Sequence, residues 1–372
     1  MKKVLIYSVL LILGLIGSQV LGGKGKDVID LITLWCLSFI MIHVGNEFDI
    51  DKNNPRQYAW DYLVAGTAAA FPWIFCAAYF VWVLNTDSWK DALVLARFSS
   101  PTSAGVLFSM LAAAGLSATW VFRKARVLAI FDDLDTILLM IPLKMLMVGM
   151  RWELMVNLVV IVVLLFLAWR YMHKLEWPTS YPWVLLYAGV IAGVCELVYY
   201  TTSIFEDVMP IHLEVLLPAF VLGCMMKRSE AHSDEPGGHE EGHSHESEEQ
   251  RVAGIITGTF MVFVGLSMPV INTDGMSWNT LLIHVLLITL VSNLGKMFPM
   301  FCYRDEAPLK ERLALSISMF PRGEVGAGVL VASMGYGLGG TALIVAVLSL
   351  ALNLVLTGLF IIGVQELIKE RA

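Results

Sequence analysis

The chain has 372 residues, of which 57% are hydrophobic and 15% charged, and its formal net charge at pH 7 is −7. Charge on about a quarter of the residues is usual for a soluble domain, so the composition excludes an ordinary soluble globular protein, and no basic patch suggests nucleic-acid binding. Apolar runs of roughly 20 residues are long enough to cross a bilayer as helices. We therefore expect an all-α integral membrane protein that lies in the lipid bilayer.

The apolar runs predict about 12 transmembrane helices. In chain order, their expected ranges are 3–22, 28–47, 59–84, 91–115, 126–149, 153–172, 182–203, 210–226, 251–271, 278–302, 312–334 and 339–366. The first range is long for a signal peptide and ends in a poor cleavage site, so we interpret it as a retained helix.

The loops between these ranges predict the orientation, because Lys and Arg concentrate on the cytoplasmic side of a membrane. With a cytoplasmic N-terminus, the outside loops contain Lys24, Lys26, Lys90 and Arg151, and the inside loops contain most of the other basic residues. We therefore expect a multi-pass protein of the cell (inner) membrane with both termini in the cytoplasm.

Residues 229–250 are rich in Glu, His, Gly and Ser, which predicts a disordered cytoplasmic loop. Within them, the spacing of His243 and His245 predicts a weak regulatory site for zinc or nickel. A solvated linker without a metal is the alternative interpretation. The five cysteines are scattered without metal or redox spacing, so no cofactor is expected.

Two predicted spans are interrupted in matching places. Pro101 and Gly105 fall in the middle of the fourth span, and Pro321 and Gly323 fall in the middle of the eleventh. Proline removes a backbone donor and clashes with the preceding turn, so each tract alone indicates a simple kink. However, the triplets of spans 59–150 and 278–366 have opposite topology, and interrupted helices in inverted repeats indicate the binding site of a transporter.

Ionisable residues occur inside the fifth and tenth spans. Asp132, Asp133 and Asp135 stand in one apolar run, where each carboxylate costs a few kcal/mol to insert. Snorkelling to the interface is the alternative, but Asp132 lies about 9 Å along the helix from Arg126. Lys296 has a similar predicted depth, so we expect an ion pair between Asp132 and Lys296 across the two repeats.

Two more charged residues follow the second interruption. Arg322 and Glu324 stand at mid-span in the eleventh range, where an isolated charge would be unfavourable. We expect them to form or to join another set of neutralising charges.

These tracts together resemble a known family. Phe131-Asp132-Asp133, Gly295-Lys296 and Pro321-Arg322-Gly323-Glu324-Val325 occur in the order found in bacterial sodium/proton antiporters of the monovalent cation:proton antiporter superfamily. The branch that they resemble has paired aspartates and an intramembrane lysine, and Thr102-Ser103 resembles its Thr-Ser pair at the helix crossover.

The resemblance implies an antiporter fold with two crossed, discontinuous helices, in which 59–150 and 278–366 form the ion-translocation core. Ranges 1–58 and 153–271 would be mainly dimerisation or scaffold helices. It also implies a homodimer, elevator-like alternating access, and exchange of Na⁺, with Li⁺ or K⁺ as alternatives, for H⁺.

The resemblance further implies roles for single residues. Asp133 would be the principal cation and proton site, Asp132 the partner of Lys296, and Thr102 and Ser103 would lie beside the ion. Asp135 and Lys144, the latter also within the fifth span, depart from the family pattern, which leaves cation preference and proton stoichiometry open.

Three other functions remain as alternatives. A cation channel also needs intramembrane carboxylates, but a buried Asp–Lys pair would obstruct its pore. A sodium-coupled symporter of related fold would require an organic solute for flux. A membrane enzyme or metal-regulated receptor is suggested only by the histidines of the loop, since the sequence contains no metalloprotease or nucleophile motif.

Overall fold

The protein is described by a computed structural model. The described residues are 2–22, 24–47, 55–86, 88–148, 153–204, 213, 215–227, 241–268, 277–335 and 337–369. Within these ranges every regular secondary-structure element is a helix. The one β-type contact among the described residues is an isolated bridge between Leu175 and Met226. The predicted all-α class is confirmed.

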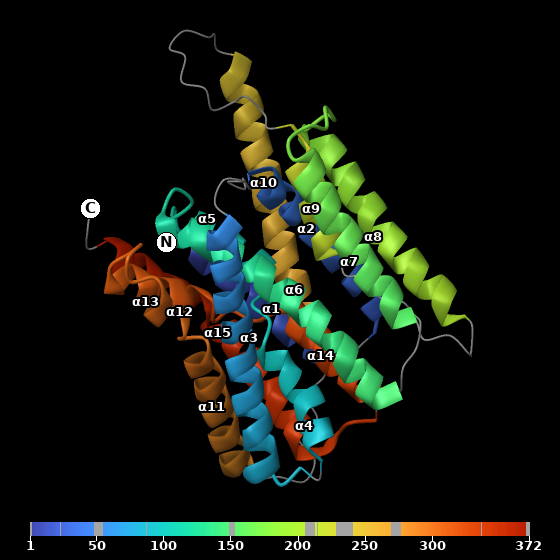
Figure 1. Ribbon diagram of the computed structural model, residues 1–372, viewed down its shortest axis with the longest axis vertical. Coiled ribbons are helices and arrows are strands. Elements are labelled where there is room, and N and C mark those ends of the chain that lie inside the picture. Colours follow the sequence, from blue (N-terminus) through green and yellow to red (C-terminus); the bar gives the residue numbers. More distant parts are fainter. Residues whose placement is uncertain are drawn as a thin grey trace. The chain divides into compact units, whose positions relative to one another are not determined.

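The chain divides into two compact units. Their helices are labelled in Figure 1. Unit 1 comprises residues 1–26, 52–147 and 261–372, and unit 2 comprises residues 27–51 and 148–260. The helices of unit 1 are α1 (Lys2–Leu21), α3 (Pro55–Trp82), α4 (Trp89–Ala96), the 3₁₀ helix η1 (Arg97–Ser99), α5 (Ala104–Ala113), α6 (Trp120–Val148), α11 (Trp278–Gly295), α12 (Pro299–Cys302), α13 (Leu309–Ser318), α14 (Glu324–Gly335) and α15 (Gly340–Lys369). Unit 2 contains α2 (Lys26–Glu47), α7 (Glu153–Tyr171), α8 (Tyr181–Ser203), α9 (Leu216–Met225) and most of α10 (Glu241–Leu266).

Unit 1 contains both predicted core triplets, but it also contains α1, which we had grouped with the scaffold helices of 1–58. This grouping of α1 differs from the expected one because α1 packs against α15 and α5. Gly14 also permits a close approach between α1 and the end of α10, since a Cβ on Gly14 would overlap the Val262 carbonyl oxygen. The assignment of unit 2 to dimerisation stays a prediction.

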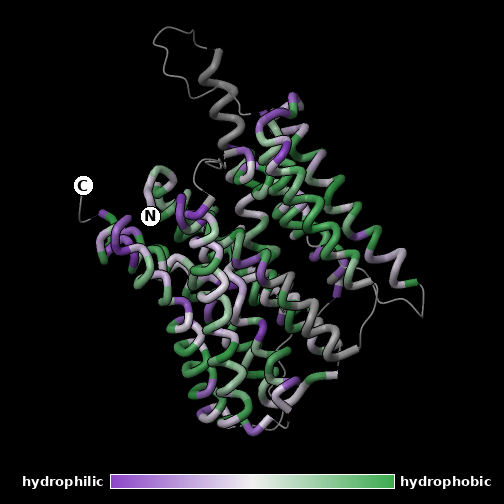
Figure 2. Tube along the Cα trace, viewed as in Figure 1, coloured by the Kyte–Doolittle hydropathy of each residue, from purple (hydrophilic) through white to green (hydrophobic). Residues whose placement is uncertain are grey.

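Every predicted span contains a described helix. Six helices are long and apolar enough to cross a membrane on length and composition alone: Lys2–Leu21, Asp27–Asn46, Arg56–Trp82, Tyr181–Ser203, Trp278–Cys302 and Gly340–Lys369. Figure 2 shows many hydrophobic residues along the helices that are visible in this view. The broken helices and the highly charged α6 are not among the six, so the number of twelve crossings stays a prediction.

The predicted loop 229–250 has two parts. Residues 228–240, with His232 and His239, lie outside the described residues. Residues 241–250 form the first turns of α10, which differs from the loop that we expected there. The side chains of His243 and His245 are outside the described part, so the proposed metal site stays a prediction.

Both predicted helix interruptions are confirmed. After η1, residues 100–103 are not helical and α5 begins at Ala104, where the Ser103 hydroxyl accepts a 3.4 Å hydrogen bond from Val106 N. The second interruption separates α13 from α14 at residues 319–323. Gly323 allows the two breaks to meet closely, because a Cβ on it would lie 2.9 Å from Ser103 Oγ.

Candidate ion-binding site

An ion pair at the crossing of the two triplets forms the centre of the site. Lys296 Nζ lies 2.7 Å from Asp132 Oδ2, and both side chains are 0% exposed. Two charges out of contact with water are tolerated only with good geometry and further hydrogen bonds. The predicted Asp132–Lys296 pair is therefore present in the structure, between α6 and the end of α11.

Local backbone structure stabilises both members of the pair. Asp132 Oδ2 also accepts a 2.7 Å hydrogen bond from Thr102 N, just before α5, whose N-terminal dipole favours a negative charge. Lys296 is the C-cap residue of α11, where the dipole favours a positive charge. Gly295 allows this end of α11 to reach α3, because a Cβ there would lie 2.5 Å from Pro72 N.

Backbone and hydroxyl groups connect the two interruptions directly. Ser103 N donates to Pro321 O at 2.9 Å, and Thr102 Oγ1 donates to Met319 O at 3.1 Å. Thr102 and Ser103 are thus at the crossover, as the family resemblance implied. Their hydroxyl hydrogen bonds hold the breaks in place, and their contact with a cation stays a prediction.

Arg322 is also at the crossover and is 1% exposed. We expected it to join a set of neutralising charges, and Asp132 does act on it electrostatically. Its hydrogen-bond acceptors, however, are uncharged groups. Its guanidinium donates to Ser99 O at 2.8 Å, to Asn293 Oδ1 at 2.7 Å, to Ser292 O at 3.0 Å and to Phe320 O at 3.1 Å. The planar fork of an arginine thus connects η1, α11 and the second break. The side chain of Glu324 is outside the described part of the structure, so its role stays a prediction.

Asp133 follows the ion-paired Asp132 on α6 and is 3% exposed. A buried carboxylate beside a fixed ion pair can bind a small cation through hard oxygen ligands, and it can bind a proton at the same atoms. The structure therefore brings together Asp132, Asp133, Thr102, Ser103 and Lys296. Within the described residues, no group of three or more His, Cys, Asp or Glu side chains could hold a metal ion.

Several residues of this region were not assigned a role from the sequence. Asn293 binds Arg322, and the side-chain amide of Asn353 on α15 lies 3.0 Å from Asn293 Oδ1. Arg97 is 0% exposed and donates to Ser100 Oγ at 2.7 Å. Arg97 carried a signal, because an arginine inside an apolar run indicates a functional position. The two asparagines carried no comparable signal, since their partners are distant in sequence.

A second buried charge cluster connects α3, α6 and the segment after α12. Lys124 Nζ lies 3.1 Å from Asp61 Oδ1 and 2.9 Å from Glu306 Oε2, and Tyr303 OH donates to Asp61 Oδ1 at 2.8 Å. Burial is the largest cause of a raised pKa of the Tyr303 hydroxyl, and the negative charge of the nearby Asp61 carboxylate raises this pKa further. This cluster joins elements of both triplets away from the ion pair.

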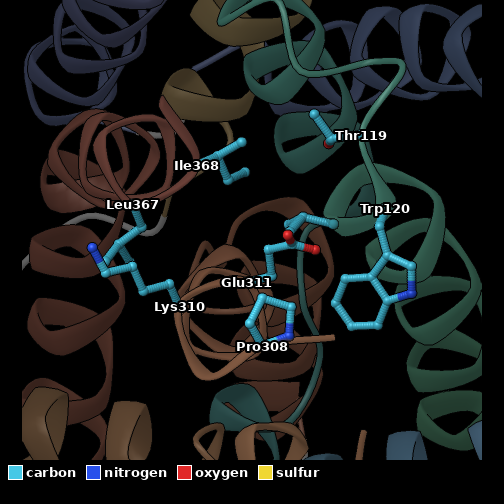
Figure 3. A pocket seen from close by; sticks show the side chains of 8 residues that line it. Thr119, Trp120, Pro308, Lys310, Glu311, Leu367 and Ile368 are labelled. Atoms are coloured by element: carbon cyan, nitrogen blue, oxygen red, sulfur yellow. The ribbon is translucent and has the colours of Figure 1, made fainter. Parts of the chain in front are cut away.

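Unit 1 also has a surface cavity of about 510 Å³ where α6 and α13 begin and α15 ends (Figure 3). Its lining residues are Thr119, Trp120, Val121, Pro308, Lys310, Glu311, Leu367 and Ile368. None of them is a predicted ion-site residue, so the cavity is separate from the crossover.

The chain matches the family described as sodium/hydrogen exchanger, transmembrane, over residues 4–365. The chain belongs to the sodium/hydrogen exchanger family. This is a family of transporters rather than enzymes, and membership supports a membrane protein that performs cation/proton antiport.

The fold of this exchanger is similar to that of an archaeal relative. The sodium proton antiporter MjNhaP1 from Methanocaldococcus jannaschii, solved at pH 8, has 16% sequence identity and a TM-score of 0.61, with 97% of this chain and 90% of that chain covered. An electron-microscopy structure of the same antiporter has 16% identity and a TM-score of 0.63, with 95% and 90% covered. At this identity the likeness shows the fold alone. A comparison with curated proteins gives no match.

Proposed function

We propose that the protein is a secondary active antiporter that exchanges a monovalent cation, Na⁺ in the first place, for protons across the cell (inner) membrane. The observation that carries this proposal is the buried Asp132–Lys296 pair at the crossing of two interrupted helices, with Asp133 next to it. A buried pair of opposite charges would obstruct a continuous channel, and it suits a site that opens to one side at a time.

In this proposal Asp133 binds the cation and the proton alternately. Its carboxylate oxygens are hard ligands, and a protonated carboxyl group cannot coordinate a cation with the same strength. Cation binding on one side therefore requires proton release on that side. Thr102 and Ser103 complete the site from the first break.

Lys296 and Asp132 couple a second proton to this exchange. With no cation bound, the two side chains neutralise each other. When a cation settles on Asp133, Asp132 turns toward it and Lys296 loses its counter-charge. A buried ammonium without a counter-charge releases its proton more readily. Exchange would then move two protons per cation and would be electrogenic.

The transport cycle in this proposal is an elevator-like movement of unit 1, which contains both interruptions and all six proposed ion-site and coupling residues that the structure describes. Those six are Thr102, Ser103, Asp132, Asp133, Lys296 and Arg322. Unit 2 would form the dimer contact of a homodimer, and both termini would face the cytoplasm. Cross-linking of the purified protein in lipid tests the dimer.

The decisive experiment uses proteoliposomes loaded with a pH-sensitive dye and preset with an inside-acid gradient. Pulses of Na⁺, Li⁺ and K⁺ are added over a range of pH, with the Asp133→Asn variant in parallel. Saturable dequenching by Na⁺ that the variant lacks supports the proposal. Cation flux that neither saturates nor moves protons would identify a channel, and a requirement for an organic solute would identify a symporter.

A further inference from the structure

The site contains a third acid, Asp135, that the exchange scheme does not use. We propose that Arg97 is the counter-charge of Asp135, and that this pair fixes the electrostatic potential at Asp133 and thereby the cation affinity without itself binding an ion. The inference rests on the proposed antiport function, which it deepens by naming two residues that set the affinity for the cation.

Arg97 is held in place from three directions. Its NH1 group donates to Ser100 Oγ at 2.7 Å, and that hydroxyl donates to Ala69 O of α3 at 2.9 Å. Its NH2 group donates to the main-chain oxygen of Asp135 at 3.0 Å. The guanidinium also lies over the Trp73 ring, 4.8 Å from its centroid. Arg97 therefore fastens the first break to α3 and to the acidic stretch of α6.

Asp135 is equally enclosed. It is 5% exposed, and its carboxylate accepts a hydrogen bond from Tyr62 of α3. Arg97 donates to the main-chain oxygen of Asp135, which brings the guanidinium charge close enough to act on the carboxylate electrostatically. A carboxylate in this setting stays charged only with a compensating cation nearby. Arg97 supplies that positive charge from the neighbouring element η1.

Arg97 and Asp135 add one positive and one negative charge to the described crossover, so its charges balance only while both or neither are present. Among the described side chains of η1, the acidic stretch of α6, the end of α11 and the second break, the buried acids are Asp132, Asp133 and Asp135, and the buried bases are Arg97, Lys296 and Arg322. Without Arg97, Asp135 would add a negative charge within two residues of Asp133. Without Asp135, Arg97 would add a positive charge.

The balance makes opposite predictions for the two single variants. Asp135→Asn removes one of the two carboxylates that act on Arg97 and leaves the site more positive, so the KM for Na⁺ should rise by about tenfold. Arg97→Gln leaves Asp135 uncompensated, so the KM should fall by about tenfold while kcat falls because the bound cation leaves slowly. The double variant should return the KM to within about threefold of wild type.

A conservative variant separates charge from structure. Arg97→Lys keeps the positive charge but loses the planar fork that reaches both Ser100 and Asp135. It should therefore keep a KM close to that of wild type and lower the melting temperature. The matched surface controls are Arg304→Gln and Asp305→Asn, both exposed and outside the helices.

The experiment measures Na⁺-dependent proton movement in proteoliposomes for wild type, both single variants, the double variant, Arg97→Lys and the controls. Melting curves of the purified proteins, with and without Na⁺, report folding and binding independently of flux. The inference is supported if Asp135→Asn and Arg97→Gln shift the KM in opposite directions and the two shifts cancel in the double variant. A folded double variant without exchange makes Asp135 an ion carrier and overturns it, as does a double variant less stable than both singles. Failure of the antiport proposal looks different, because wild type itself would then move no protons in response to a cation.

Discussion

Lys296 Nζ and Asp132 Oδ2 are 2.7 Å apart, although the two residues belong to different triplets of the chain. Each side chain is excluded from water, so each depends on the other for its electrostatic stabilisation, and the Asp132 carboxylate also depends on the Thr102 N–H. The pair therefore connects the stability of the core to the chemistry of the site.

We expect Lys296→Gln to lower the free energy of unfolding by about 3 kcal/mol or more, because it leaves Asp132 buried without its counter-charge. Under the proposed coupling, the exchange that survives should also lose its dependence on membrane voltage. Melting curves measure the first effect, and reversal potentials in proteoliposomes measure the second.

The competing interpretation gives this pair a purely structural role, with proton coupling on the aspartates alone. It predicts the same loss of stability and an unchanged voltage dependence. The Asp132→Asn/Lys296→Gln double variant should recover part of the lost stability, since it leaves no unpaired charge. A wild-type reversal potential that corresponds to one proton per cation would end the two-proton proposal.

Asp133→Asn should abolish cation/proton exchange and leave the fold intact. The amide keeps the shape of the side chain but neither carries a charge for the cation nor titrates as a carboxyl group does. Dequenching assays and melting curves measure the two effects, with the exposed Asp305→Asn as the matched control. Wild-type rates of Na⁺-driven proton movement in the variant would show that the ion binds elsewhere.

Much of the core was predictable because its signals are local. Apolar runs of membrane-crossing length predicted most helices, and Pro101 and Pro321, each with glycine close by, marked both breaks. Proline alone would not have been enough, because Pro72 lies inside the continuous helix α3. The Asp132–Lys296 pair followed from depth alone, because two buried charges at the same level in opposite repeats need each other.

What the sequence could not predict depends on tertiary contacts. Arg322 was expected only among neutralising charges, but the crossing of the breaks also surrounds it with carbonyl groups and Asn293, to which it donates hydrogen bonds. The position of α1 with unit 1 depends on glycine contacts that hydropathy does not record. The end of α11 at Gly295 depends on its approach to Pro72, which lies on a helix far away in sequence.

The His/Glu-rich segment should tune transport without being required for it. Histidine gains a positive charge as pH falls through about 6.5, so acidification makes the segment less negative. Deleting Glu230 to Glu249 should leave maximal exchange in place and shift its pH profile, and His243→Ala/His245→Ala should remove any response to Ni²⁺. An unchanged pH profile and metal response in both variants would leave only a solvated linker.

Lys124 provides the sharpest test of the second charge cluster. Its ammonium contacts Asp61 and Glu306. The side chains of Lys124 and Asp61 are deeply buried, with relative exposures of 6% and 3%, whereas that of Glu306 is 33% exposed. Lys124→Met keeps the length of the side chain but leaves Asp61 without its cation, so the free energy of unfolding should fall by about 3 kcal/mol.

Arg123→Met is the control on the same helix, because Arg123 is exposed and its loss should change stability by less than about 0.5 kcal/mol. Thermal unfolding of the purified protein measures both. Equal melting temperatures for the two variants would mean that the cluster contributes nothing to holding α3 and α6 to the segment after α12.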